Sequence, residues 1–201
     1  MKISDIPSMG GQAIGPDLVK YAKQVDDGVI VEIGAWLGAG TAYLALGARG
    51  KGTPVYSFDK FEARHSEVKK AKRAGWTIKG DTLPLVQQTL EKLGLSDNVI
   101  LHKGLAGSEE WDLPIGLFVL DTCKGYDPFN QIMRTYSPYF IPGKTVLVFM
   151  DFWYSVLESS KPSHMNQKQW ADERSGMLRP LIEKMSDKSS ASFLYLGGDL
   201  C

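Results

Sequence analysis

The residues best suited to chemistry lie in the decapeptide EIGAWLGAGT, residues 32–41. The apolar run at 29–33 is typical of a strand buried on both faces, and residues 41–48 favour an Ala- and Leu-rich helix. Gly34 permits a tight turn between these elements, and Gly38 permits close approach of a ligand. The free N–H groups at the start of the helix suit a carboxylate or a phosphate. The alternative is that the glycines serve only the turn.

A second polar group is expected at the end of the next strand, residues 54–58. Asp59 follows this strand, 27 residues after Glu32. An acidic residue at this place accepts the hydroxyl hydrogens of a ribose in dinucleotide-binding folds. We therefore predict a nucleoside-type ligand between the glycine turn and Asp59. The alternative is a solvated carboxylate beside Lys60.

Two further carboxylates close the fourth and fifth expected strands, residues 116–120 and 145–150. Because adjacent parallel strands lie ~4.8 Å apart, Asp121 and Asp151 could converge on one point. Two facing carboxylates are unfavourable unless a cation or a shared proton lies between them. Oxygen ligands of this kind suit Mg²⁺ or Ca²⁺. The alternative is that both side chains only orient loops.

Strands alternate with helices along the chain, which predicts right-handed crossovers. We expect one α/β domain over residues 1–201 with a doubly wound, mostly parallel sheet in three α/β/α layers. Residues 1–28 would form an arm and a helix, and residues 152–168 an acceptor-side loop. After the fifth expected strand, only one further strand is evident in the sequence. The expected strands are 29–33, 54–58, 99–102, 116–120, 145–150 and 193–196, and the main expected helices are 16–25, 41–48, 83–93, 128–136 and 169–185.

Composition narrows the possible classes of function. The 201 residues contain 23 Lys and Arg and 23 Asp and Glu, so the chain lacks the basic surplus of a general nucleic-acid binder. The two cysteines, Cys123 and Cys201, do not have zinc-site or disulfide-framework spacing. We find no signal peptide and no apolar run of the ~20 residues needed to span a bilayer. These features predict a soluble, cytoplasmic protein without nucleic-acid or membrane partners.

The glycine turn also carries a family resemblance. EIGAWLGAGT resembles the first motif of class I S-adenosylmethionine-dependent methyltransferases, and VYSFD followed by KFE resembles their second motif. Residues 117–153 resemble the fourth- and fifth-strand region of small-molecule O-methyltransferases of the macrocin and catechol types. The resemblance covers residues 29–153. It implies a Rossmann-like fold, S-adenosylmethionine as cofactor, and methylation of a hydroxyl on a small-molecule or sugar-like acceptor.

The same resemblance implies where the cofactor binds. Residues 34–38 would hold its methionine part and Asp59 its ribose. Adenine would lie near residues 103–108, where this chain has KGLAGS in place of the family's frequent acidic residue, so backbone groups or Ser108 would contact it. The implied cofactor-binding residues are Glu32, Gly34, Ala35, Gly38, Thr41, Asp59, Lys60, Gly104, Ser108 and Asp121.

Two routes for proton removal from the acceptor follow. The spacing of Asp121 and Lys124 resembles the catechol-type group, in which a metal holds a substrate oxygen and the lysine takes its proton. The metal ligands would then be Asp121 and Asp151, although Phe152 stands where metal-dependent members have Asn. A metal-free route relies on alignment, which can supply ~7–11 kcal/mol of the barrier, with His164 as general base.

Two other function classes compete with a methyltransferase. A nicotinamide-dependent oxidoreductase is disfavoured, because Trp36 occupies the second glycine position of the dinucleotide-binding fingerprint. A non-catalytic S-adenosylmethionine-binding or partner module would keep the fold and the pocket without turnover. A homodimer is compatible with either class.

Overall fold

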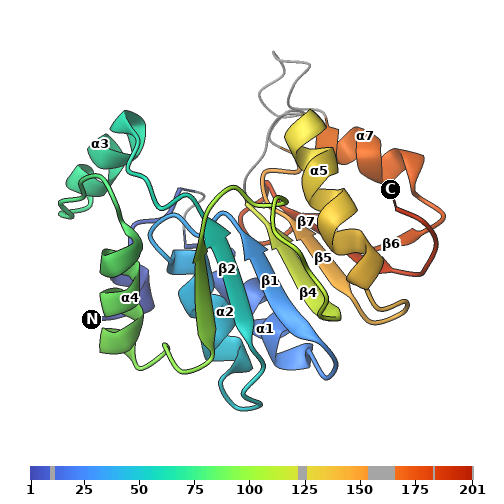
Figure 1. Ribbon diagram of the computed structural model, residues 1–201, viewed down its shortest axis with the longest axis horizontal. Coiled ribbons are helices and arrows are strands. Elements are labelled where there is room, and N and C mark those ends of the chain that lie inside the picture. The colour runs from blue at the N-terminus through green and yellow to red at the C-terminus, as the bar shows by residue number, and fades with distance from the viewer. Residues whose placement is uncertain (10–11, 122–125, 154–165, 183, 201) are drawn as a thin grey trace.

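A single seven-stranded sheet dominates the protein (Figure 1). The computed structural model describes residues 1–9, 12–121, 126–153, 166–182 and 184–200. The strand order is β3-β2-β1-β4-β5-β7-β6. The strands are β1 (Val29–Ile33), β2 (Val55–Asp59), β3 (Val99–Lys103), β4 (Ile115–Leu120), β5 (Val146–Phe149), β6 (Leu178–Ile182) and β7 (Ala191–Tyr195).

Strands β1 to β5 run parallel, whereas β7 is antiparallel to both β5 and β6. The chain moves outward from β1 through β2 to β3 and then crosses back to β4. The order therefore reverses between β1 and β4, which is where doubly wound sheets bind ligands beyond their carboxyl ends. The predicted mostly parallel, doubly wound sheet is confirmed.

Helices cover both faces of the sheet (Figure 1). No helix in the described ranges is long and apolar enough to cross a membrane. One face carries α1 (Gly15–Gln24), α2 (Ala39–Ala48) and α4 (Leu83–Leu93), and the other carries α5 (Tyr126–Tyr136) and α7 (Asn166–Glu173). Helix α3 (His65–Arg73) lies beyond the carboxyl edge of the sheet, and short 3-10 turns occupy Ile3–Asp5 and Ser137–Tyr139.

The two central strands are buried along their whole length. All five residues of β1 and all six of β4 are buried, as expected for apolar strands between two helical layers. Their side chains alternate between two cores, so that Val31 and Phe118 pack toward α5 while Ile30 and Val119 pack toward α1 and α2. Glu32 is the one charged residue in these two strands.

The predicted helix over 169–185 is wrong in its second half. Helix α7 ends at Glu173, and the chain returns as β6, which pairs antiparallel with β7. The sheet therefore ends in an antiparallel pair of strands, β7 and β6, where the sequence showed only one strand. Pro180 is compatible with β6 because this strand lies at the edge of the sheet, where a missing N–H donor leaves no ladder bond unmade. The strand conformation of residues 178–182 is set by their pairing with β7, and the helical spacing of their apolar residues does not decide it.

Candidate functional site

The turn after β1 depends on left-handed backbone at three residues. Gly34 has φ 103°, Trp36 has φ 46°, and Gly38, the N-cap of α2, has φ 82°. At Gly38 a Cβ would also lie 2.8 Å from a methyl carbon of Val86 in α4. The glycines are thus required by backbone conformation and by packing. Trp36 adopts the same region without that freedom, which is a local source of strain.

Glu32 forms a buried polar centre beneath this turn. Its side chain is 2% exposed, and its Oε2 accepts hydrogen bonds from the hydroxyls of Thr41, at 2.6 Å, and Ser57. Burial raises the pKa of Glu32 to about 7, opposed by the two hydroxyl bonds and reinforced by the charge of Asp59. A Cβ at Gly40 would collide with Oε1 of Glu32. Gly40 therefore makes room for this carboxyl group.

Asp59 ties the turn to the end of β2. Its Oδ2 accepts the backbone N–H of Trp36 and its Oδ1 accepts that of Phe61, both at 2.8 Å. A carboxylate oxygen can accept more than one hydrogen bond, so both oxygens keep capacity for ribose hydroxyls. The contact between Asp59 and ribose stays a prediction.

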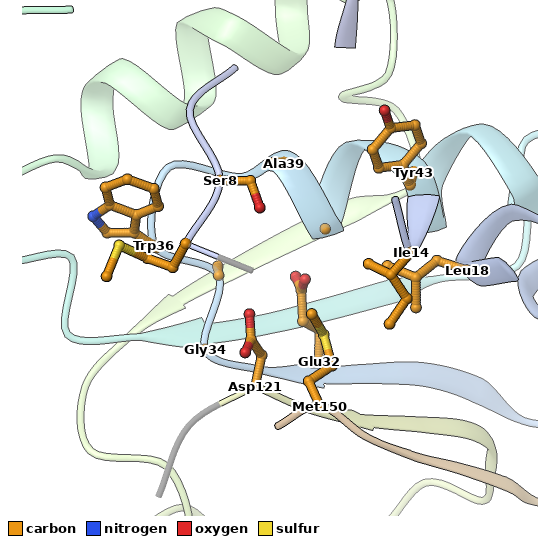
Figure 2. A pocket seen from close by; sticks show the side chains of 13 residues that line it. Ser8, Ile14, Leu18, Glu32, Gly34, Trp36, Ala39, Tyr43, Asp121 and Met150 are labelled. Carbon is orange, nitrogen blue, oxygen red and sulfur yellow. The ribbon is translucent and has the colours of Figure 1, made fainter. Parts of the chain in front are cut away.

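An open pocket lies above β1, between the start of α2 and the N-terminal segment (Figure 2). About 420 Å³ of space free of protein atoms lies in and over it, part of which is open solvent. The carboxylates of Glu32 and Asp121 point into it from the sheet, and Ser8 faces them from the other wall. Of the predicted cofactor-binding residues, Glu32, Gly34, Ala35 and Asp121 line this pocket.

The other predicted cofactor-binding residues lie outside the pocket wall. Thr41 and Gly38 support the site from beneath, as the hydroxyl donor to Glu32 and as the N-cap of α2. Lys60, Gly104 and Ser108 are exposed. The Ser108 hydroxyl donates to the carbonyl oxygen of Leu105 at 2.6 Å, so it stabilises its own loop. The roles of these residues toward a cofactor stay predictions.

Sequence reasoning missed an acidic residue in the loop after β3. The carboxylate of Glu109 accepts the backbone N–H groups of Gly107, at 3.0 Å, and Ser108, at 3.1 Å, together with the hydroxyl of Tyr136. This loop is the region where the resemblance places adenine. Glu109 therefore fixes the shape of the loop. The sequence feature that could have identified this residue is an acidic side chain in a short, glycine-containing connection.

The pocket wall also contains residues that carried no sequence signal. Ser8, Met9 and Ile14 come from the N-terminal segment, Tyr43 from α2, and Met150 from the end of β5. They are far apart in sequence and belong to no motif. Only the packing of the N-terminal segment over the turn brings them together.

The predicted catalytic and metal-binding residues divide into three groups. Lys124 and His164 lie outside the described residues. Asp121 lines the pocket, whereas Asp151 does not and has left-handed backbone, φ 62°, just past β5. Within the described ranges no three His, Cys, Asp or Glu residues are grouped so that they could hold a metal ion. The Mg²⁺ prediction thus gains no support from this geometry.

No protein-family model matches the chain. Among solved structures, it is similar to the calicheamicin methyltransferase CalS11, with TM-score 0.62, 18% identity, and coverage of 93% of this chain and 79% of that one. It is also similar to the Podospora anserina methyltransferase PaMTH1 bound to SAH (S-adenosylhomocysteine), with TM-score 0.60, 13% identity and coverage of 91% and 78%. The Bacillus cereus O-methyltransferase in complex with SAH gives TM-score 0.59, 16% identity and coverage of 90% and 80%. The chain therefore has the fold of the S-adenosylmethionine-dependent methyltransferases.

Proposed function

We propose that the protein is an S-adenosylmethionine-dependent methyltransferase that methylates a hydroxyl of a small-molecule or sugar-like acceptor. The observation that carries this proposal is the pocket at the point of strand-order reversal, bordered by Gly34, Glu32 and Asp121. The proposal is supported by structural neighbours: CalS11 is a TDP-rhamnose 3'-O-methyltransferase, and TomG of Streptomyces achromogenes is an O-methyltransferase of tomaymycin synthesis.

The residues of the pocket fit the chemistry of this cofactor. S-adenosylmethionine carries a positive sulfonium and a positive ammonium group, and the carboxyl groups of Glu32 and Asp121 face the space they would occupy. Gly34 lets bare backbone border the pocket. In this proposal Gly34 and Ala35 contact the methionine part, Asp59 contacts ribose, and the cofactor supplies the methyl group.

The acceptor would be aligned at the ends of β4 and β5, beside Asp121. Methyl transfer from a sulfonium is a direct displacement, so alignment of the hydroxyl oxygen with the methyl group is the main requirement. Removal of the hydroxyl proton is assigned to Lys124 with Asp121, or to His164. Participation of Mg²⁺ through Asp121 and Asp151, a cytoplasmic location and a homodimer stay predictions.

Calorimetry with S-adenosylmethionine, SAH and NAD tests the cofactor class. We expect binding of the first two and none of NAD. Tight binding of NAD, or no binding of either adenosyl compound, would refute the proposal. If binding is found but no hydroxyl acceptor is methylated, the non-catalytic module is favoured instead. Once an acceptor is known, an assay with and without EDTA decides whether a metal is required.

A further inference from the structure

The N-terminal segment forms one wall of the pocket although it belongs to neither the sheet nor its crossovers. Met9 lines the pocket, and Ser8 faces Glu32 and Asp121 across it (Figure 2). Ile6, two residues earlier, is 1% exposed and is part of the apolar core that lies under the glycine turn. This wall is therefore packed into the protein rather than lying loosely on its surface.

Two side chains from the α3 region hold this wall by its backbone. The ammonium group of Lys70 donates to the carbonyl oxygen of Met9 at 2.5 Å. The indole Nε1 of Trp76 donates to the carbonyl oxygen of Asp5 at 3.1 Å. Because both acceptors are main-chain carbonyls, these bonds fix the path of the segment on either side of Ile6.

The segment is also held on its far side, at α2. The Tyr43 hydroxyl donates to Oε1 of Gln12 at 2.7 Å, and Nε2 of Gln12 donates to the carbonyl oxygen of Ile6 at 2.6 Å. The ring of Tyr43 lies directly against Gly15, where a Cβ would come within 2.5 Å of it. The wall is thus fixed both to the α3 region and to α2.

Helix α3 needs an explanation other than connecting β2 to β3. Helix α4 already lies in this crossover and packs on the sheet, while α3 stands beyond the carboxyl edge (Figure 1). Ala71 is the one buried residue of α3, and it belongs to the same apolar core as Ile6. Helix α3 thus shares an apolar core with the N-terminal segment and also bonds to it through Lys70.

We propose that residues 3–9 are a fixed wall of the cofactor pocket, and that Lys70 and Trp76 are positioning residues that hold this wall and so set how tightly the cofactor is retained. This inference rests on the proposed function, because it takes the ligand of the pocket to be S-adenosylmethionine or SAH. Helix α3 and the segment after it, which carry Lys70 and Trp76, would then affect cofactor binding without contacting the cofactor.

The test measures SAH affinity and SAH dissociation rate for Lys70→Met, Trp76→Phe and the double variant. Each change removes one hydrogen-bond donor and keeps most of the apolar volume. We expect the dissociation constant to rise about three- to fivefold for each variant and tenfold or more for the pair, mainly through faster dissociation. Lys70→Arg retains a donor and should restore most of the affinity.

The matched control is Lys69→Met with Lys51→Met. Lys69 is exposed on the same helix, and the ammonium group of Lys51 also donates to a main-chain carbonyl, that of Val25, at 3.2 Å. Neither residue lines the pocket, so SAH affinity should stay within twofold of that of the unmodified protein. Melting temperatures of both double variants show whether any loss reflects general destabilisation.

Hydrogen exchange of the ligand-free protein separates failure of this inference from failure of the proposed function. We expect faster exchange of residues 5–9 in Lys70→Met/Trp76→Phe than in the control. Unchanged exchange, or unchanged SAH affinity and dissociation in the presence of faster exchange, would overturn the inference while leaving the proposed function intact. If the unmodified protein does not bind SAH, the proposed function and this inference fall together.

Discussion

The two halves of the sheet's carboxyl edge are built in different ways. Around β1 and β2, the carboxyl groups of Glu32 and Asp59 each accept two hydrogen bonds from side chains or backbone of neighbouring elements. At the ends of β4 and β5, Asp121 lines the pocket, whereas Asp151 lies outside its wall. The first half carries a polar network beneath the pocket, and the second lies where the proposed acceptor would approach.

Under the proposed function, the first half would bind the cofactor and the second would admit the acceptor. A site that holds a cofactor in one orientation needs groups whose positions are fixed before binding, and satisfied buried hydrogen bonds provide such rigidity. The comparison predicts that substitutions in the β1–β2 half change cofactor binding more than equivalent substitutions at the end of β5.

The largest expected effect is that of Gly34→Arg. A long side chain at φ 103° would strain the turn and fill the pocket, so SAH affinity should fall about a thousandfold or more in calorimetry. Gly52→Arg is the matched control, because Gly52 also has positive φ, 65°, with open space around it. Retained SAH binding by Gly34→Arg would remove the pocket from its proposed role.

The next effect is on the pH dependence of stability. The pKa of Glu32 is about 7 in the folded protein against 4.5 for an ordinary glutamate, so between these pH values the folded state keeps a proton that the unfolded state releases. The free energy of unfolding therefore falls as pH rises from 4.5 to 7. The loss reaches about 3 kcal/mol once the pH exceeds 7. Urea denaturation at pH 5, 6, 7 and 8 measures this loss.

Glu32→Gln is the control for this titration. The amide cannot ionise and nearly preserves the shape of the side chain, so the stability of the variant should change less between pH 5 and pH 8 than that of the unmodified protein. The lowered pKa values of Asp26 and Asp81 act at more acidic pH and do not affect this window. Parallel pH profiles for the two proteins would show that the Glu32 carboxyl titrates normally.

The smallest expected effect compares the two strand-end carboxylates. Asp121→Asn removes a negative charge that faces the pocket, and SAH affinity should fall about tenfold. Asp151→Asn should leave SAH affinity within twofold, because Asp151 is not part of the pocket wall. An equal loss in both variants would mean that the two carboxylates act on the cofactor together, and the contrast between the halves would fail.

The parts of the site that could be predicted from sequence are those formed by neighbouring residues. The β-branched run of β1 followed by Gly34 and Gly38 predicted a buried strand and a turn, because strand propensity and positive φ are properties of individual residues. The position of Asp59 followed from strand alternation. Glu109 was missed because its partner Tyr136 lies on a different element.

The sequence alone thus determined where β1 to β5 and β7 lie along the chain, the glycine turn and the carboxylates at the strand ends, since these depend on local periodicity and residue type. The tertiary structure decided which of these carboxylates reach the pocket, that Leu178–Ile182 is a strand, and that residues 6–9 pack over the turn. These features depend on contacts between residues distant in sequence, such as Trp76 with Asp5 and β6 with β7. No local pattern specifies such contacts, because their free energy is gained only when the segments meet in the folded chain.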